Sequence, residues 1–531
     1  MMHYAPAPVQ PALVARASRG FSTLFLPLIA IGCAHAADYT KIKSYLVPVT
    51  TDYVVQPLLS VGDQVPNTSD RTKIYQMIGI PDGLGAHRAN GGRTVLYMNH
   101  ELGNTVMSEP NVGGALNRGA FVSRFILDRE GRVLSGERAY DFVHDEETKT
   151  VLAAPQANNT TRGFGRFCSG SLAWREAGFD RPIFISGEES GGAATFDGKG
   201  GLAVAIFDHE LHTLVKMGRF AWENTLVRPD DGEWTVAMCM EDGPTTPDNQ
   251  LYLYVGRKNR SPGASVLSRN GLDTGKLYAF VSTTPGKTSE LNFTTGSITG
   301  KWVELPDQTS RTEAQLEADS DAVGAFGFIR IEDGAWSKTD KNTFYFVTTG
   351  NGTGNKLGRV YEVKFNPANI LGTTTIKTIY NNDTVAAIGG DMAFAPDNID
   401  TSKDYLMLQE DGTSDSRPEY AKRAREGSIW RLDLKNNFAA KRVAEMNPNG
   451  AVAPAGGVPP VVGPGVWETS GIIDATDFFG ADSWLTVVQA HGPSLAPAPN
   501  TVEDGQLLLM LPARAKIRSD DDRNDDRDDR Q

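Results

Sequence analysis

Cysteine is scarce in this sequence, and that scarcity excludes a scaffold held together by disulfides. Only three cysteines occur among 531 residues, whereas disulfide-rich secreted domains depend on several pairs. Cys239 lies in the apolar run VAMCM and is expected to be a core residue. Cys168 lies in the glycine-rich stretch GFGRFCSGS, where three interpretations stay open: a metal ligand, a disulfide partner or an inert thiol.

Long apolar runs are absent beyond the N-terminus, so no later segment predicts a transmembrane helix. Residues 1–36 have the organisation of a secretory signal peptide. Arg16 and Arg19 precede the apolar run 21–33, and the AHA that follows fits a cleavage site. We therefore expect a periplasmic or secreted protein that does not insert into the membrane after processing.

Basic residues are in deficit. The chain has 52 Lys and Arg against 65 Asp and Glu, and cleavage after residue 36 removes two arginines, leaving 50 against 65 and a net charge of −15. This balance argues against nucleic acid as a partner and is compatible with binding multivalent cations. The last residues, 513–531, end in a mixed-charge run without apolar residues and are expected to be disordered.

Common catalytic motifs are also missing. No phosphate-binding glycine loop, dinucleotide motif or nucleophile elbow occurs. The stretch FDHELHTL (207–214) approaches the zinc-protease motif, but its His209 and His212 are three residues apart instead of the four that would place them on one helix face. We reject a zinc-protease helix here.

What the sequence does contain is a repeated pair of apolar segments. The first segment of each pair ends on polar residues, and the second starts with glycine or a polar residue. The pairs are 94–101 with 119–128, 181–192 with 200–208, 235–243 with 250–258, 342–350 with 358–365, 404–412 with 427–434, and 484–492 with 505–512. Repeated strand pairs at irregular spacing predict an all-β fold, a six-bladed β-propeller with loop insertions, formed by residues 37–512 as a single domain.

In a propeller, equivalent strand ends meet around one channel, so the polar ends are expected to converge. They are Glu101, Glu189, Glu241, Asp242, Glu410 and His491. Clustered carboxylates repel one another strongly unless cations hold them together. The alternative is that about half of these acids only cap turns.

Several stretches resemble the PhoX-type alkaline phosphatase family of secreted bacterial proteins. They occur in order across residues 75–512. They are YMNHE (97–101), FCSGSLAW with ISGEES (167–190), MGRFAWEN (217–224), FGFIRIEDG (326–334) with NTFYFVTTG (342–350), GGDMAFAPD (389–397) with LMLQEDG (406–412), and WETSGIIDATDFFGADSWLTVVQAH (467–491).

This resemblance implies a six-bladed propeller that hydrolyses small phosphomonoesters at a cluster of Fe³⁺ and Ca²⁺. We expect the protein to be a monomer. The resemblance implies Arg330 as the phosphate-binding catalytic residue. The implied metal ligands are Cys168, Glu189, Glu223, Glu332, Asp391, Glu410 and Glu101. A soft thiolate suits iron and hard carboxylates suit calcium. The chain departs from the family pattern at Trp222, and it has no lysine shortly before Cys168, so a second phosphate-binding cation is left between Arg162 and Arg166.

Two other functions compete with the phosphatase. One is a calcium-dependent propeller hydrolase of another type, such as a phytase or a lactonase. The other is a non-catalytic propeller that binds a ligand and keeps calcium for stability. Cys168 favours a site with iron over one with calcium alone, and Arg330 beside Glu332 favours catalysis.

Overall fold

The structure, a computed structural model, describes residues 40–230, 232–243, 247–350, 354–448, 463–491 and 500–513. The predicted signal peptide, and the predicted charged tail beyond its first residue, lie outside these ranges. No helix in these ranges is long and apolar enough to cross a membrane.

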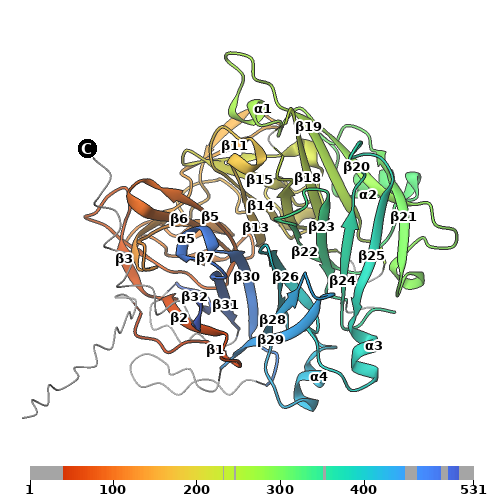
Figure 1. Cartoon of the computed structure of the whole chain (residues 1–531). Helices are drawn as coiled ribbons and strands as arrows, with labels where there is room; N and C mark the ends of the chain where they lie inside the picture. Colours follow the sequence, from red (N-terminus) through yellow and green to blue (C-terminus); the bar gives the residue numbers. More distant parts are fainter. Residues whose placement is uncertain are drawn as a thin grey trace, which may run out of the picture. The chain divides into compact units, whose positions relative to one another are not determined.

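Six strands form a ring around a central axis, and each is the innermost strand of an antiparallel sheet (Figure 1). Neighbouring inner strands are in contact all the way round, so that the last packs against the first. They are β5 (Pro81–Ala89), β13 (Phe167–Ala173), β17 (Trp222–Val227), β22 (Ile331–Trp336), β26 (Pro396–Thr401) and β30 (Glu468–Asp474). A closed ring of such sheets is a β-propeller, here with six blades.

Each blade runs outward from its inner strand as a meander. Blade one continues through β6 (Arg93–His100), β9 (Phe121–Leu127) and β10 (Val133–Arg138), and blade two through β14 (Ile183–Glu188), β15 (Ala203–Phe207) and β16 (Glu210–Thr213). Blade three continues through β18 (Trp234–Glu241), β19 (Leu251–Arg257), β20 (Lys276–Ser282) and β21 (Ser297–Glu304), and blade four through β23 (Thr343–Thr348), β24 (Arg359–Lys364) and β25 (Thr374–Asn381). Blade five continues through β27 (Tyr405–Glu410), β28 (Ser428–Asp433) and β29 (Ala439–Met446), and blade six through β31 (Trp484–Ala490) and β32 (Asp504–Pro512).

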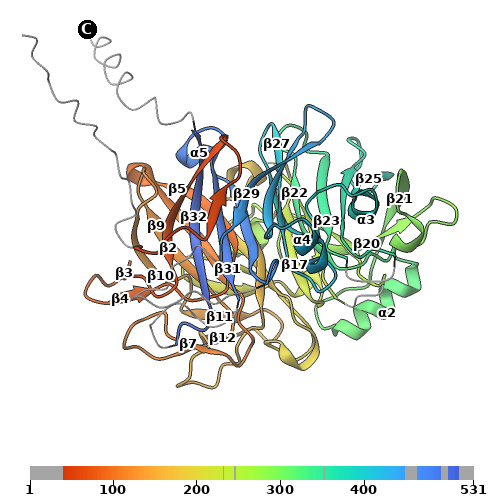
Figure 2. The same cartoon turned by 90° about the horizontal axis from the view of Figure 1, so that it is seen from below.

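The ring is closed by the N-terminal part of the described chain. Strand β2 (Tyr53–Ser60) pairs with β32, with Tyr53 opposite Pro512 and Ser60 opposite Gln506, and Figure 2 shows β2, β32 and β31 side by side. Strand β1 (Leu46–Pro48) adds a fifth strand to blade five. Opening the ring therefore requires breaking a sheet that joins residues far apart in the sequence.

Insertions decorate the outer edges of the blades. The hairpin β11 (Phe142–Asp145) and β12 (Thr150–Ala153) extends blade two, because β11 pairs in parallel with β16. Strand β21 pairs with β25, so blades three and four form one nine-stranded sheet. The remaining elements are β3 (Gln64–Pro66) with β4 (Ile74–Gln76), β7 (Met107–Ser108) with β8 (Asn117–Arg118), the helices α1 (Val266–Arg269), α2 (Glu313–Val323), α3 (Asn382–Ala387), α4 (Arg417–Lys422) and α5 (Thr476–Phe479), and single 3₁₀ turns at Asn90–Gly92, Arg175–Ala177, Gly192–Ala194, Val215–Met217 and Glu290–Asn292.

The hydrophobic core consists of separate clusters in and between the blades. Trp222 at the start of β17 is fully buried, and its ring stacks on Phe220 with 4.0 Å between centroids. Both belong to a cluster that includes residues of blades two and three. Large aromatic rings fill the wedge between twisted sheets, so neighbouring blades hold one another in place.

The all-β, six-bladed prediction is confirmed, and the six predicted strand pairs have a simple place in it. Each pair is the second and third strand of one blade: β6 with β9, β14 with β15, β18 with β19, β23 with β24, β27 with β28, and β31 with β32. The pairs predicted from the sequence did not include the inner strands, which carry side chains that face the channel.

Candidate metal centre at the channel mouth

Each blade brings two side chains to one end of the channel, and antiparallel pairing explains why. An inner strand begins where the second strand of its blade ends, so Phe167 of β13 lies opposite Glu188 of β14. The next residue on each strand, Cys168 and Glu189, lines a shared cavity. A further hydrogen bond, from the Glu189 backbone N–H to the Arg166 carbonyl at 2.8 Å, fixes this arrangement.

The same arrangement recurs in blades one, three, four and five. In each of these blades the backbone N–H of the residue after the second strand donates to the carbonyl of the residue before the inner strand, and we call this the closing hydrogen bond. It joins Glu101 to Ile80, Asp242 to Ala221, Thr349 to Arg330, and Asp411 to Ala395, at 2.9 to 3.0 Å. The inner-strand position is occupied by Asp82, Cys168, Glu223, Glu332, Asp397 and Glu468. The position after the second strand is occupied by Glu101, Glu189, Asp242, Thr349, Asp411 and His491.

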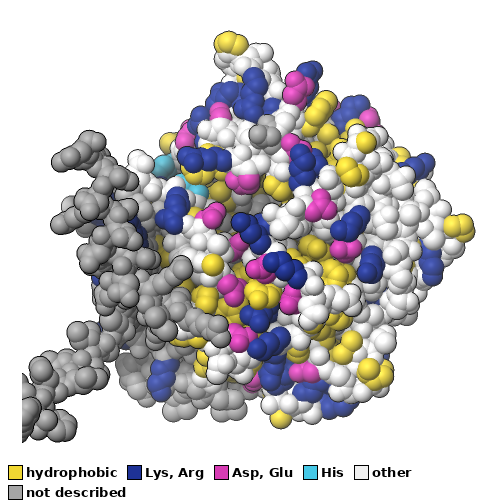
Figure 3. Space-filling model, in the orientation of Figure 1, with side chains coloured by type: hydrophobic (Ala, Val, Ile, Leu, Met, Phe, Trp, Pro, Cys, Tyr) yellow, Lys and Arg dark blue, Asp and Glu magenta, His cyan; other side chains and the backbone are white. Residues whose placement is uncertain are grey.

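Most of these side chains line a cavity of about 110 Å³, enough space for a few groups the size of water or a metal ion. Figure 3 shows acidic and basic side chains gathered near the middle of this face, over the central strands of Figure 1. Three overlapping groups have possible ligand atoms within 4.8 Å of one another. They are Asp82 with Glu101 and Cys168, Cys168 with Glu189 and Glu223, and Glu223 with Glu332 and Asp397.

The paired acids at the strand ends have divided roles. Successive residues of an extended chain point to opposite sides, so the acid before each channel residue faces into the blade. Glu188 accepts hydrogen bonds from the backbone N–H groups of Gly165, Phe196 and Leu202, and Glu241 accepts one from Gln250. Of the acids expected to converge, Glu241 thus serves local structure instead.

Glu410 and Asp391, implied as metal ligands by the resemblance, are not brought to the cavity. Glu410 is fully buried and forms a two-point ion pair with Arg425, at 2.6 and 2.8 Å. Asp391 lies 2.9 Å from the same guanidinium. The channel position of blade five belongs to Asp411, which follows Glu410 and therefore points the other way.

Two arginines flank the cavity from equivalent places in blades two and four. Arg166 contacts Glu101 and Glu189, each at 2.7 Å. Arg330 contacts Asp242 at 2.9 Å and Glu332 at 3.1 Å. Of the two candidates for a second cation, Arg166 is at the site, whereas Arg162 bonds to the Ala193 carbonyl on an exposed loop.

The carboxyl groups of the cavity are held in an electrostatically unfavourable arrangement. Burial raises the pKa of Glu223 well above its ordinary value, and the neighbouring charges of Glu332 and Glu189 raise it further. Burial and nearby acids likewise raise the pKa of Asp82, Glu189, Glu332 and Asp397. Glu101 is the exception, because Arg166 and Gln489 outweigh the effect of burial and lower its pKa.

Several oxygen atoms of this cluster need a cation. Asp82 Oδ1, Glu223 Oε1 and Asp397 Oδ1 are buried, and each is without a hydrogen-bond partner among the described residues. An unpaired buried acceptor is costly, and several lie within reach of common points. Oxygen donors at this density suit calcium, and the thiol beside them suits iron, so the residues present fit the implied metals.

Cys168 is the buried second residue of the inner strand β13, although the stretch around it is rich in glycine. Burial raises the pKa of its thiol, and the charges of Asp82 and Glu223 raise it further. Such a thiol ionises only when a cation binds it. Neither Cys168 nor Cys239 forms a disulfide, so the disulfide interpretation is wrong.

A layer of hydrogen-bonded polar side chains lies along the inner strands beside the acids and links different blades. Ser169 donates to Glu223 at 3.0 Å and accepts from Asn398, also at 3.0 Å, and Ser470 donates to Asn398. Gly83 allows close approach: a side chain there would come within 2.2 Å of the Gly170 backbone nitrogen. The layer fixes the spacing of the inner strands and hence of the acids.

Asp82, Asp397 and Glu468 were not identified from the sequence as site residues. The signal was a dipeptide at the start of each inner strand, or across its start in β30, with an apolar residue followed by an ionisable one. The six are Pro81-Asp82, Phe167-Cys168, Trp222-Glu223, Ile331-Glu332, Pro396-Asp397 and Trp467-Glu468. Trp222, noted as a departure from the family pattern, thus stands at a position that is apolar in every blade.

Comparison with known proteins gives a family and a similar structure. The model of the family "Alkaline phosphatase PhoX" matches residues 208–453, and no curated protein matches the chain. The structure resembles that of Pseudomonas fluorescens PhoX in complex with vanadate, a transition state analogue, with a TM-score of 0.62 and 16% identity over 90% of this chain and 98% of that one.

A weaker likeness links the chain to an α-L-arabinanase of Penicillium chrysogenum. The TM-score is 0.41 and the identity 9%, over 86% of this chain and 99% of that one, which is too low to bear on function.

Proposed function

We propose that this chain, which belongs to the PhoX alkaline phosphatase family, hydrolyses small phosphomonoesters in the cavity at the channel mouth. The observation that carries the proposal is the convergence of two arginines, one thiol and a ring of buried carboxylates on a single small space. Anion-binding and cation-binding groups are both needed where a phosphate meets metal ions.

The acidic ring would hold the metal cluster. Cys168, with Glu189 and Glu223, offers a mixed sulfur and oxygen ligand set that suits Fe³⁺, and Glu223, Glu332 and Asp397 offer oxygen donors that suit Ca²⁺. When bound, these ions would neutralise the oxygens of the phosphoryl group and supply an activated nucleophile.

The arginines would bind the phosphoryl group of the substrate. Both guanidiniums reach solvent, with 49% of the Arg166 side chain and 20% of the Arg330 side chain exposed. Each is held by two carboxylates, which fix its plane and leave other N–H groups available. A planar guanidinium binds phosphate oxygens at two points, so the pair would orient the ester with its phosphorus toward the acids.

The test is hydrolysis of p-nitrophenyl phosphate alongside metal analysis of the purified protein. Wild-type protein should contain iron and calcium and be active. Cys168→Ser should lose iron and activity while folding survives, and Cys239→Ser, the matched control in a buried strand away from the cavity, should keep both. Full activity and iron in Cys168→Ser would contradict the proposal, and an active protein with calcium alone would favour the other calcium-dependent hydrolases.

The N-terminal segment of the sequence indicates that the protein is exported. We propose that residues 1–36 direct the chain to the periplasm or beyond, and that the mature protein begins at Ala37. N-terminal sequencing of protein recovered from the periplasm or the medium tests this. A cytosolic protein that retains its N-terminus would contradict it.

A further inference from the structure

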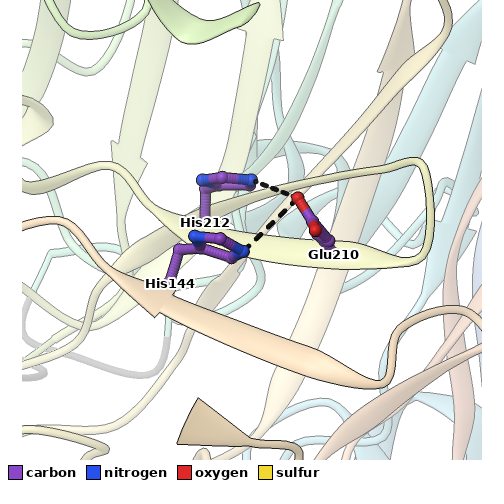
Figure 4. A group of neighbouring side chains, drawn as sticks. All are labelled: His144, Glu210 and His212. Atoms are coloured by element: carbon purple, nitrogen blue, oxygen red, sulfur yellow. Dashed lines mark ion pairs between the residues drawn. The ribbon is translucent and has the colours of Figure 1, made fainter. Parts of the chain in front are cut away.

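A second possible metal site lies on the outer edge of blade two, far along the sheet from the inner strand. His144 of β11 and the pair Glu210 and His212 of β16 meet there. Figure 4 shows both imidazole rings turning a ring nitrogen toward the same oxygen of Glu210. The distances from Glu210 Oε2 are 3.3 Å to His144 Nε2 and 3.5 Å to His212 Nε2.

The strand geometry explains why these three residues share a face. Glu210 and His212 are two apart in β16, so their side chains point the same way. Strand β11 runs parallel to β16, with His144 directly opposite His212, and the two rings stack with their centroids 4.1 Å apart. The stretch rejected above as a zinc-protease helix therefore supplies two of the three groups from a strand, and His209 is not one of them.

The hydrogen bonds leave a lone pair facing a carboxylate. His212 Nδ1 lies 2.9 Å from Glu146 Oε1, and because a carboxylate accepts, Nδ1 donates. A neutral His212 then carries its lone pair on Nε2. His212 is about nine-tenths buried, and its Nε2, like that of His144, has no hydrogen-bond partner among the described residues. The Glu210 side chain is 40% exposed, but its oxygen and the His212 nitrogen are two acceptors directed at one another, and a cation between them would relieve their repulsion.

The distances fit a tetrahedral transition metal. Ligand bonds of about 2.0–2.1 Å from zinc to nitrogen or oxygen place two tetrahedral ligands about 3.3 Å apart, close to both separations to Glu210. Two imidazoles and one carboxylate form a ligand set that zinc uses, with water completing the tetrahedron. The Glu146 contact matches the carboxylate that commonly orients a metal-binding histidine through its other nitrogen.

We propose that His144, Glu210 and His212 bind a divalent transition-metal ion, zinc in the first place, which fastens the β11–β12 hairpin to blade two. The parallel ladder between β11 and β16 has only three paired positions, and β12 is largely exposed. A metal would link residues 66 positions apart (210 minus 144) and so add to the ion pairs of Glu147 with Lys199 and Arg219 that already hold the hairpin. This inference is independent of the proposed function.

The direct test titrates the whole mature protein with Co²⁺ and follows the visible absorption of tetrahedral cobalt, then displaces it with Zn²⁺. Wild type should bind one more equivalent than His212→Ala, and the affinity of His212→Ala should fall by more than about 100-fold. Glu146→Gln should weaken binding by about 10–100-fold. The matched control is His209→Asn, because His209 lies in the adjacent turn with a positive φ of 64° that asparagine tolerates.

A second readout reports on the hairpin itself. Lys149, at its tip, is exposed, and Zn²⁺ should slow tryptic cleavage there in wild type and His209→Asn but not in His212→Ala. A circular dichroism spectrum that is the same for every variant shows that the propeller is folded. Cobalt titrations that superimpose for wild type and His212→Ala, or cleavage that Zn²⁺ leaves unchanged in wild type, would overturn the proposal.

Discussion

Glu410 and Asp411 are adjacent, yet the structure assigns them opposite roles that mutation can separate. Glu410 neutralises Arg425, whose side chain is 3% exposed and packs among Phe394, Tyr420 and Trp430. Asp411 lines the cavity, where burial and the charge of Glu468 raise its pKa to about 7. We predict that Glu410→Gln costs stability without changing metal content, and that Asp411→Asn does the reverse.

The magnitude follows from the surroundings of Arg425. Removing one partner of a buried ion pair typically costs about 3–5 kcal/mol. Asp391, 2.9 Å from Arg425 and 35% exposed, still neutralises part of the charge, and glutamine keeps the oxygen that accepts from the Phe394 N–H. The lower end, about 3 kcal/mol, is therefore expected, which for a chain of this length lowers the melting temperature by about 3 °C.

The assay pairs urea denaturation, followed by tryptophan fluorescence, with metal analysis of the folded fraction. Asp411→Asn should lose metal and phosphatase activity, while its metal-free form should be at least as stable as metal-free wild type because one repelling charge is gone. A folded Glu410→Gln protein that has lost metal would refute the division of roles, as would an Asp411→Asn protein with full metal content and activity.

Three further predictions concern charge. Arg330→Lys should lower p-nitrophenyl phosphate turnover by at least about tenfold while metal content is kept, because lysine cannot reproduce the two-point contact. Unchanged turnover would show that Arg330 does not bind the phosphoryl group. Metal-free protein prepared with a chelator should melt higher at about pH 6 than at about pH 9, because the folded state, with its raised carboxyl pKa values, binds more protons than the unfolded chain; equal melting temperatures would contradict this. Burial raises the pKa of Asp63 to about 6, so its contribution to the free energy of unfolding falls as pH rises from about 4 to about 6. Asp63→Asn should remove up to about 3 kcal/mol of this fall in urea titrations at different pH. A pH dependence identical to that of wild type would show that Asp63 is not its source.

The outer part of each blade could be predicted from the sequence because its strands follow simple rules. The second and third strands alternate regularly or are continuously apolar, and a turn joins them. The inner strands do not, because their register shifts near the channel, as between Trp222 and Thr225 and between Ile331 and Gly334. A shift of this kind puts consecutive polar residues in a strand, and in the sequence such residues look like part of a loop.

The site could be predicted in part, and the error at Glu410 has a physical origin. Glu101, Cys168, Glu189, Glu223, Glu332 and Arg330 all lie at the cavity, where the motifs placed them. The motif that contains Glu410 does reach the cavity, but through the adjacent residue Asp411. The sequence does not show which of two adjacent acids faces inward. The closing hydrogen bond decides it, since in blade five the Asp411 N–H, and not that of Glu410, bonds to the Ala395 carbonyl.

The place of the two arginines depends on backbone conformation, which the sequence does not show. Arg166 and Arg330 have positive φ angles of 47° and 53°, as do Ile80 and Ala395 just before the inner strands of blades one and five. Left-handed geometry is uncommon outside glycine and costs about 1–3 kcal/mol, so it persists only where the surroundings enforce it. Here the closing hydrogen bond and the packing of the inner strands both do so. Because the strained position recurs from blade to blade, an arginine there, in blades two and four, is directed over the acids by the fold itself, and Arg166 and Arg330 face the same cavity although 164 residues separate them (330 minus 166).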